Sequence, residues 1–240
     1  GLIEHYDFRF ESPPLQMDSG LMYQAIANGA VDVISGFATD GRIPAYDLLI
    51  LDDDRNFFPP YYAVPIIRKD TLDEYPRLEE VLERLSGKID DATMQRLNFR
   101  VDDEGIRPDR VALEFLREEG FIGGDDSTGD GSAGTVRIGS KQFTEQEILG
   151  HLTAYMIEYH TDIAVDRRLN LGGTMICFNG VKSGNLDMYV EYTGTALVSI
   201  LKHEVIVDAD EAYELVAREF RERYNLVVME PFGFNNTYTI

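Results

Sequence analysis

A short segment near the middle of the chain divides it in two. Residues 123–134 read GGDDSTGDGSAG, in which one alanine is the only apolar side chain. A segment of this composition has no hydrophobic face to bury, and its many glycines leave the backbone free to move. We therefore expect a flexible acidic linker at 123–134, with one folded half before it (1–122) and a second after it (135–240).

Both halves alternate predicted strands with predicted helices. After the linker, apolar side chains recur at three- and four-residue spacing from Ile148 to Tyr159, which predicts a helix. The predicted strands are 31–36, 48–51, 63–67, 136–140, 186–190 and 226–229, and the other predicted helices are 21–27, 77–86, 91–97, 108–119, 193–201 and 210–224. This alternation favours an α/β fold with mostly parallel sheets flanked by helices.

The charge of the chain excludes several classes of partner. Asp and Glu number 43 against 22 Lys and Arg, so the net charge is −21. Nucleic acids need clustered positive charge and anionic membrane surfaces repel acidic proteins, so we expect neither as a partner. No run reaches the roughly 18 apolar residues of a membrane span, so membrane attachment would need an anchor or fused segment outside these residues. The acid-rich, Lys-poor composition predicts a halophilic source, because concentrated salt screens self-repulsion.

Catalytic and metal-binding patterns are missing from the sequence. The four histidines show no HExxH spacing, and the chain has no GxSxG elbow, P-loop or GxGxxG turn. The acidic run at 52–54 lacks the alternating spacing of a calcium loop and is typical of a solvated strand end. Cys177 is the only cysteine and lies in an apolar stretch, which predicts a buried thiol. We expect no enzymatic activity, no metal and no cofactor.

Aromatic side chains are more informative, because several stand at predicted strand ends and turns. These are Phe37 in SGFATDGR, Tyr61 in FFPPYY, Tyr192 in EYTGT and Tyr238 in FNNTY. Open α/β sheets bind ligands at the carboxyl ends of their strands. Aromatic faces gathered there suit a desolvated cation, and a quaternary ammonium has no N–H that such a cage would leave unpaired. Any one of these residues alone is more typical of a half-buried core position, and it is the group of them that favours a binding site.

Long segments resemble the glycine betaine, choline and carnitine-binding subunits of osmoprotectant ABC importers. GSKQFTEQEILGHLTAYMIEYHTDIAVDRRLNLGGT and LDMYVEYTGTALVSIL are similar to the N-terminal half of that family, and PFGFNNTY to its crossover into the second lobe. GLIEHYDFRF, LMYQAIANGAVDVISGFATDGRI and DLLILDDDRNFFPPYYAVPIIR are similar to its C-terminal half. The resemblance implies a two-lobed type II periplasmic-binding-protein-like fold. Lobe one would hold 39–122 and 136–232, and an incomplete lobe two would hold 1–38 and 233–240.

The same resemblance implies which residues form the site. Tyr192 and Tyr61 from lobe one, with Tyr238 and Phe37 from lobe two, match the aromatic box of the family. Lys141 and Thr195 match positions that contact the carboxylate of betaine-type ligands, and Gln142 stands where Asn or Asp is more usual. Asp40 and Arg42 are expected to form a structural ion pair near the hinge.

The order of the two halves is the main departure from the family. The C-terminal half comes first, and several dozen residues of lobe two, including an arginine that helps hold a betaine carboxylate, are missing between FNNTY and GLIEHYDF. One account is a circular permutation. The other is a junction between tandem modules, which the abrupt ends at Gly1 and Ile240 favour.

The resemblance implies a role without a catalytic step. It predicts an extracytoplasmic component of an ABC importer, tethered to the membrane in the full-length protein, that delivers a small quaternary-ammonium ligand to permease subunits. The alternatives are another zwitterion such as ergothioneine or proline betaine, or a sensory or non-binding fragment of the same fold.

Overall fold

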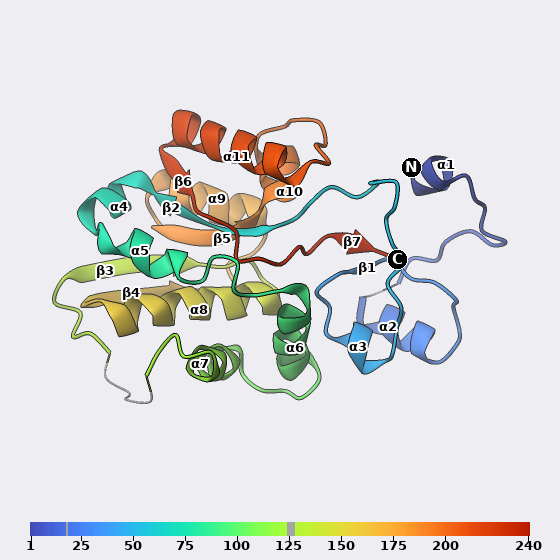
Figure 1. Cartoon of the computed structure of the whole chain (residues 1–240), viewed down its shortest axis with the longest axis horizontal. Helices are drawn as coiled ribbons and strands as arrows, with labels where there is room; N and C mark the ends of the chain where they lie inside the picture. Colours follow the sequence, from blue (N-terminus) through green and yellow to red (C-terminus); the bar gives the residue numbers. More distant parts are fainter. Residues whose placement is uncertain (18, 124–127) are drawn as a thin grey trace.

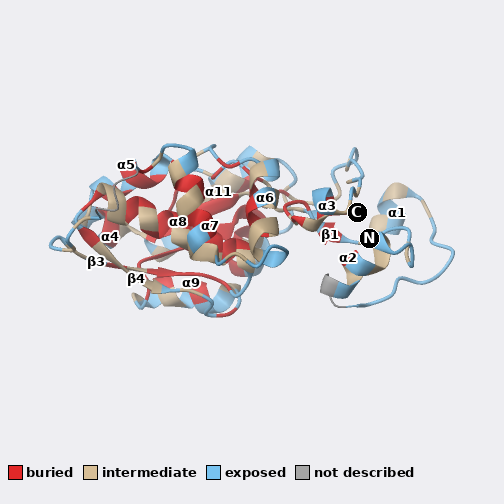
Figure 2. Ribbon diagram, turned by 90° about the horizontal axis from the view of Figure 1, so that it is seen from below, coloured by how far each residue is buried: buried red, intermediate tan, exposed pale blue. Residues whose placement is uncertain are grey.

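The chain forms a large lobe around one sheet and a small lobe beside it (Figure 1). The computed structural model describes residues 1–17, 19–123 and 128–240. The small lobe contains α1 (Leu2–Tyr6), α2 (Ser19–Ala27), α3 (Arg42–Ala45) and the short strands β1 (Gly36–Phe37) and β7 (Tyr238–Thr239). Both ends of the chain lie in this small lobe, at the right of Figures 1 and 2.

The sheet of the large lobe has five strands in the order β4-β3-β5-β2-β6. Their bounds are β2 (Ala63–Arg68), β3 (Gly134–Gly139), β4 (Ile163–Arg168), β5 (Met188–Tyr192) and β6 (Leu226–Val228). β3 pairs in parallel with β4 and with β5, whereas β2 runs antiparallel to both β5 and β6. Four strands therefore share one direction, and the prediction of a mostly parallel sheet in an α/β fold is confirmed.

Helices cover both faces of this sheet, so its strands are buried on both sides. One face carries α4 (Lys69–Glu74), α5 (Arg77–Glu83), α6 (Asp91–Asp102), α7 (Pro108–Glu118) and α8 (Thr144–His160). The other carries α9 (Thr174–Ser183), α10 (Thr193–Thr195), the π-helical segment η1 (Ala196–Ile200) and α11 (Ala209–Tyr224). Alternate residues of β2 show the division, since Val64 and Ile66 face α9 and α11 while Ala63 and Ile67 face the opposite layer. Cys177 is fully buried in the α9 layer, as predicted.

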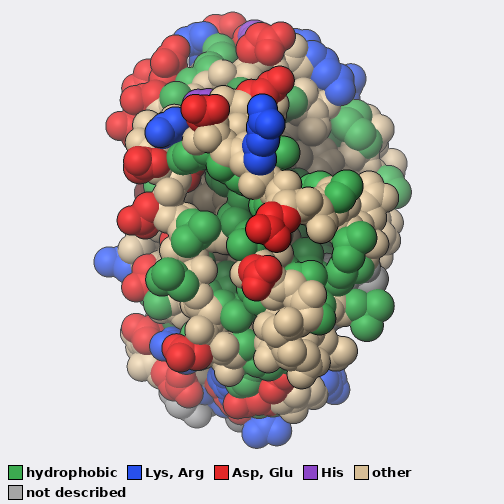
Figure 3. Space-filling view, turned by 90° about the vertical axis from the view of Figure 1, so that its right-hand side faces the viewer, with side chains coloured by type: hydrophobic (Ala, Val, Ile, Leu, Met, Phe, Trp, Pro, Cys, Tyr) green, Lys and Arg blue, Asp and Glu red, His purple; other side chains and the backbone are tan. Residues whose placement is uncertain are grey.

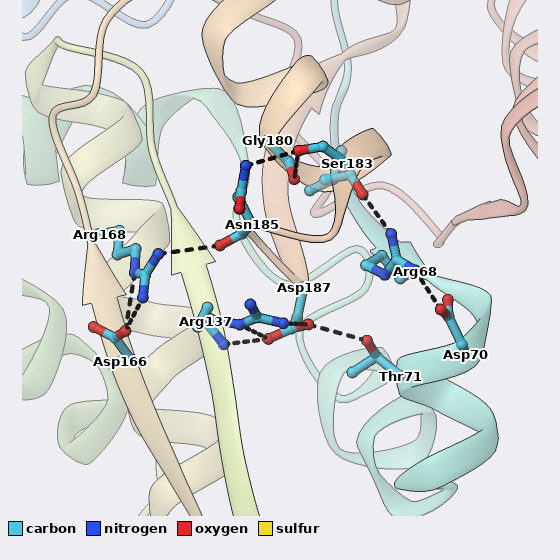
Figure 4. A network of polar contacts seen from close by, with 11 residues as sticks. Arg68, Asp70, Thr71, Arg137, Asp166, Arg168, Gly180, Ser183, Asn185 and Asp187 are labelled. Atoms are coloured by element: carbon cyan, nitrogen blue, oxygen red, sulfur yellow. Dashed lines mark hydrogen bonds and ion pairs between the residues drawn. The ribbon is translucent and has the colours of Figure 1, made fainter.

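Polar contacts fasten strands and helices at one end of this sheet (Figure 4). The carboxylate of Asp187 accepts hydrogen bonds from the Nε and Nη2 atoms of Arg137, at 2.9 and 2.8 Å, and from the hydroxyl of Thr71 at 3.4 Å. Arg68 donates to the carbonyl of Val181 at 2.8 Å and pairs with Asp70. These contacts join β2, β3, α4 and α9.

The small lobe has little core of its own. Its strands form a two-stranded antiparallel ladder in which Gly36 pairs with Thr239 and Phe37 with Tyr238. Figure 2 shows that buried residues concentrate in the large lobe and thin out around α1 and α2, and α1 has no buried residue. Figure 3 looks onto this end of the molecule and shows hydrophobic side chains spread over it. Leu15, Leu21 and Leu49 are among the exposed apolar residues.

Two predicted strands are wrong, and both fall in or beside the small lobe. In 31–36 only Gly36 is in a strand, and 48–51 forms no strand. The apolar pattern is present, but a strand needs a partner for its backbone groups. Leu51 finds a single such contact, from its N–H to the carbonyl of Ile240 at 2.8 Å. The predicted helix 193–201 is present but changes from α-helix to π-helix at Ala196.

The predicted linker lies partly outside the described residues, at 124–127. The described part returns along the turn between α8 and β4, where Gly129 N–H donates to the carbonyl of Glu158 at 2.8 Å and Ala133 N–H to that of Asp162 at 3.0 Å. None of the helices in the described ranges is long and apolar enough to cross a membrane.

Candidate ligand-binding site

A cavity of about 490 Å³ lies where the large lobe meets the small lobe. Its volume falls in the usual range for small-molecule sites. Strand ends supply much of its wall, as expected for an open α/β sheet. The lining residues are Phe37, Thr39, Asp40, Arg42, Tyr61, Asn98, Asp102, Lys141, Phe143, Thr144, Glu145, Tyr192, Thr195, Asn236 and Tyr238.

Three aromatic rings meet on the small-lobe side of this cavity. Phe37 and Tyr238 are opposite each other in the β1–β7 ladder, and their ring centroids are 4.9 Å apart. Tyr61 lies edge-on to Tyr238 at 5.7 Å, and its N–H donates to the Oδ1 atom of Asn235 at 2.7 Å. Burial raises the pKa of Tyr61, so its hydroxyl stays neutral at physiological pH. The ladder and the Asn235 contact thus bring rings from distant parts of the chain together.

Two further rings stand on the large-lobe side. Tyr192 ends β5, and its ring is nearly parallel to that of Phe143, with an interplanar angle of 20° and centroids 6.3 Å apart. The Nζ atom of Lys141 lies 4.4 Å from the Tyr192 centroid and 5.6 Å from that of Phe143. This ring pair therefore already holds a cation that the protein itself supplies.

Lys141 also forms an ion pair with Glu191, and both side chains are buried. The register of the sheet explains the pair. Gly139, the last residue of β3, is opposite Tyr189 of β5. Lys141 lies two residues past the end of β3, and Glu191 lies two residues further along β5. The Oε1 atom of Glu191 also accepts a hydrogen bond from Tyr192 N–H at 2.9 Å. The positive charge of Lys141 is therefore compensated within the protein.

Glu145, in the first turn of α8, is the most constrained polar group of the cavity. Its Oε1 atom accepts hydrogen bonds from the Tyr192 hydroxyl at 2.6 Å and the Asn236 amide at 2.9 Å. Its Oε2 atom accepts them from the Thr39 hydroxyl at 2.6 Å and the Asn98 amide at 3.0 Å. Burial raises the pKa of Glu145, and these four donors oppose that shift. The Glu145 carboxylate thus links Tyr192, on the large-lobe side, to Thr39 and Asn236, which are close in sequence to Phe37 and Tyr238 on the small-lobe side.

Two acidic residues complete the charged part of the wall. Asp40 receives two hydrogen bonds from Arg42, at 2.9 Å from Nε and 2.6 Å from Nη2. This is the ion pair expected near the hinge, and the guanidinium also stacks 4.1 Å from the ring centroid of Tyr23. Asp102 accepts a hydrogen bond from the Thr144 hydroxyl at 2.5 Å.

Residues 1–118 and 134–240 match the family described as the substrate-binding domain of ABC-type glycine betaine transport systems. The chain belongs to this family. The resemblance drawn from the sequence is therefore confirmed at the level of the family.

Individual members of this substrate-binding family align with half of the chain. The carnitine transport binding protein OpuCC of Listeria monocytogenes is 41% identical over 120 residues, which are 50% of this chain and 38% of that protein. The glycine-betaine-binding protein of Pseudomonas aeruginosa is 40% identical over 119 residues, 50% of this chain and 36% of that protein. The ergothioneine transport permease/ergothioneine binding protein EgtU of Helicobacter pylori is 39% identical over 121 residues, 50% and 22% respectively. Each alignment spans less than two fifths of the relative.

Most residues that the family resemblance selected lie together in the structure. Those that line the cavity are Phe37, Tyr61, Lys141, Tyr192, Thr195 and Tyr238. Gln142 does not line it. Its side chain is exposed, because the chain turns after β3 and the Gln142 N–H donates to the carbonyl of Gly172 at 3.0 Å.

Sequence reasoning missed Glu145, Phe143, Asn98 and Asn236. A glutamate in the first turn of a helix is usually an exposed dipole partner, so Glu145 gave no signal of burial. Spacing in GSKQFTEQ offered one hint, since it places Phe143 and Glu145 close after Lys141. Across the described residues, no group of three or more His, Cys, Asp or Glu side chains could hold a metal ion.

Proposed function

We propose that this chain is the substrate-binding part of an ABC importer and that its cavity receives the quaternary-ammonium head of glycine betaine, choline or carnitine. The observation that carries the proposal is the convergence of rings from both lobes on one cavity. Phe37, Tyr61 and Tyr238 stand on one side and Tyr192 with Phe143 on the other.

The physical basis of this binding is the attraction between a cation and the faces of aromatic rings. Each such contact contributes about 0.5–2 kcal/mol, and more when water is excluded. Methyl groups around the nitrogen make no hydrogen bonds, so an aromatic wall leaves none of them unpaired. The Lys141 ammonium, 4.4 Å from the centroid of Tyr192, supports the proposal because it shows that this wall accepts positive charge. The net charge of −21 favours the approach of a cation.

The role proposed for the chain is delivery rather than catalysis. Ligand would bind in the cavity between the lobes, the lobes would close over it, and the loaded protein would dock on permease subunits at the extracytoplasmic side of the membrane. The family to which the chain belongs supports this role. Tethering to the membrane is part of the same proposal.

A second candidate ligand is ergothioneine. It carries the same trimethylammonium and carboxylate groups as other betaines and adds an imidazole ring that bears a sulfur atom. The relative from Helicobacter pylori named for ergothioneine is about as similar to this chain as those named for carnitine and glycine betaine. Ergothioneine therefore belongs in the same binding assay.

Isothermal titration calorimetry tests the proposal. We expect heat on titration of the 240-residue chain with at least one of glycine betaine, choline, carnitine and ergothioneine. Tyr61→Ala and Tyr238→Ala should each weaken that binding by about tenfold, which corresponds to roughly 1.4 kcal/mol. Tyr213→Ala is the matched control, since Tyr213 lies on α11 outside the cavity. Absence of heat with all four compounds would contradict the proposal.

A further inference from the structure

The chain passes between the two lobes at two connections. Residues 59–62 lead from the small lobe into β2, and residues 233–237 lead from the large lobe into β7 (Figure 1). A third stretch, residues 38–41, joins β1 to α3 and lies beside them. Lobes of a binding protein turn about the few residues that connect them, so a change in the angle between these lobes has to bend or shift these stretches.

Hydrogen bonds fasten the three stretches to one another. The Asn236 N–H donates to the carbonyl of Tyr61 at 3.1 Å, which joins the two connections. The Ala38 N–H donates to the carbonyl of Thr237 at 2.9 Å, which extends the β1–β7 ladder toward the large lobe. The three stretches therefore form one unit, and a contact that holds one of them acts on all three.

One face of α6 is in contact with this unit. Three polar side chains of α6 are spaced four and three residues apart, which places them on one side of the helix. They are Asp91, Gln95 and Asn98. The Asp91 carboxylate accepts a hydrogen bond from the Asn235 N–H at 2.8 Å, and the Gln95 Nε2 atom donates to the carbonyl of Ala38 at 2.7 Å. This polar face of α6 thus contacts one connection and the end of the β1–β7 ladder.

The contact continues further along α6. The Asn98 Nδ2 atom donates to the carbonyl of Thr39 at 2.9 Å and to the carboxylate of Glu145 at 3.0 Å. Gly41 then packs directly on the helix, since a Cβ atom at this position would lie 2.5 Å from the N and Cβ atoms of Phe99. The stretch after β1 is therefore held both by side chains of α6 and by its backbone.

Another side of α6 is anchored in the large lobe. Met94 and Leu97 are buried in the core that also contains residues of α7 and α8. The polar face of α6 therefore stands on a rigid support. The rings of Phe37 and Tyr238 each adjoin in the chain a residue of the unit that this face holds, so their position relative to the large lobe depends on it.

From this arrangement we infer that the polar face of α6 sets the angle between the lobes and so aligns the small-lobe rings with the large-lobe wall of the cavity. Gln95 is the positioning residue that separates this role from ligand contact, because it bonds to the end of the β1–β7 ladder and does not line the cavity. The angle between the lobes can be measured without ligand, whereas the effect on binding rests on the proposed function.

Distances between spin labels on the two lobes test the inference in the ligand-free 240-residue chain. One label goes on Ala27→Cys in α2 and the other on Glu214→Cys in α11, both at exposed positions. Cys177 stays unlabelled because it is fully buried. Double electron–electron resonance then gives the distribution of inter-lobe distances for each variant.

Gln95→Met should broaden this distribution, because the donor to the carbonyl of Ala38 is lost. Gln16→Met is the matched control, since it carries the same substitution at an exposed small-lobe position that does not line the cavity. A distribution no broader than that of the control would overturn the inference. A purely structural role for Gln95 would give that result together with a lower melting temperature.

A wedge against α6 gives a second test. Gly41 has a φ of −65°, which alanine adopts readily, so Gly41→Ala changes only the space between this residue and Phe99. The new Cβ should push the stretch after β1 away from the helix and shift the mean distance between the labels. A mean distance that stays at the parent value would show that the lobe angle does not depend on α6 and would overturn the inference.

Calorimetry with choline links the lobe angle to binding. Gln95→Met should weaken binding by about two- to tenfold, the effect of one lost neutral hydrogen bond on the population of aligned lobes, and Gln16→Met should leave it unchanged. Unchanged binding in Gln95→Met despite a broadened distribution would overturn the alignment of the rings by α6. If the parent chain binds none of the four compounds named above, the proposed function fails, and the distances still decide whether α6 sets the lobe angle.

Discussion

Removing the hydroxyl of Tyr192 separates its structural role from its role as a ring. Tyr192→Phe keeps the ring face and deletes the 2.6 Å hydrogen bond to the buried carboxylate of Glu145. A hydrogen bond to a charged group contributes about 1.5–3 kcal/mol to stability. Each kcal/mol shifts the melting temperature of a chain this long by about 2–4 °C. The expected loss in melting temperature is therefore about 3–12 °C.

Thermal unfolding followed by circular dichroism measures this loss. Tyr159→Phe is the control, because the described part of the structure gives the Tyr159 hydroxyl no hydrogen bond, while its ring packs against the core as that of Tyr192 does. Binding of a quaternary ammonium by Tyr192→Phe should stay within about threefold of the parent, since cation–π attraction depends on the ring. A fall in melting temperature no larger than that of Tyr159→Phe would show that the hydrogen bond from Tyr192 to Glu145 adds little to the stability of the fold.

Three further perturbations follow from the same structure. Lys141→Met should lower the free energy of unfolding by about 3–5 kcal/mol, because it leaves Glu191 buried without its partner; urea unfolding measures this, and restoration by the added change Glu191→Gln is expected. Gly194→Ala should cost about 1–3 kcal/mol, since its new Cβ would lie 2.7 Å from the carbonyl oxygen of Pro60; an unchanged melting temperature would contradict the packing. Burial lowers the pKa of His151 from 6.5 to about 4, so the folded state favours the neutral ring, and this stability is present above pH 6.5 and lost as the pH falls toward 4. His151→Gln should flatten the stability profile over that interval, and an unchanged slope would argue against it.

Strong periodicity made much of the large lobe predictable. The predicted helix 210–224 is α11 (Ala209–Tyr224), and the predicted strand 63–67 is β2 (Ala63–Arg68). Apolar faces at helical or buried-strand spacing can be satisfied only by a covering layer, so the pattern determines the element. The run at 48–51 has the same apolar character, but its state depends on a strand partner far away in the chain, which local sequence cannot reveal.

The residues of the site also differ in whether the sequence could predict them. Phe37, Tyr61, Tyr192 and Tyr238 were accessible to sequence reasoning because strand ends and turns define where ligands bind in open sheets. The Lys141–Glu191 pair was not, since it depends on the register of β3 against β5. Glu145 was also missed because four donors from separate segments hold it, and no single one of those segments marks it as buried.

The central claim is that the cavity binds its ligand through positive charge on aromatic faces. The most direct measurement compares choline with 3,3-dimethylbutan-1-ol, its uncharged isostere in which carbon replaces nitrogen. Calorimetry on the 240-residue chain should show choline binding more tightly by at least about tenfold, since the two compounds share shape and hydroxyl and differ in charge. Equal binding of the two, or binding of the alcohol alone, would show that the cavity recognises apolar shape and would contradict the account.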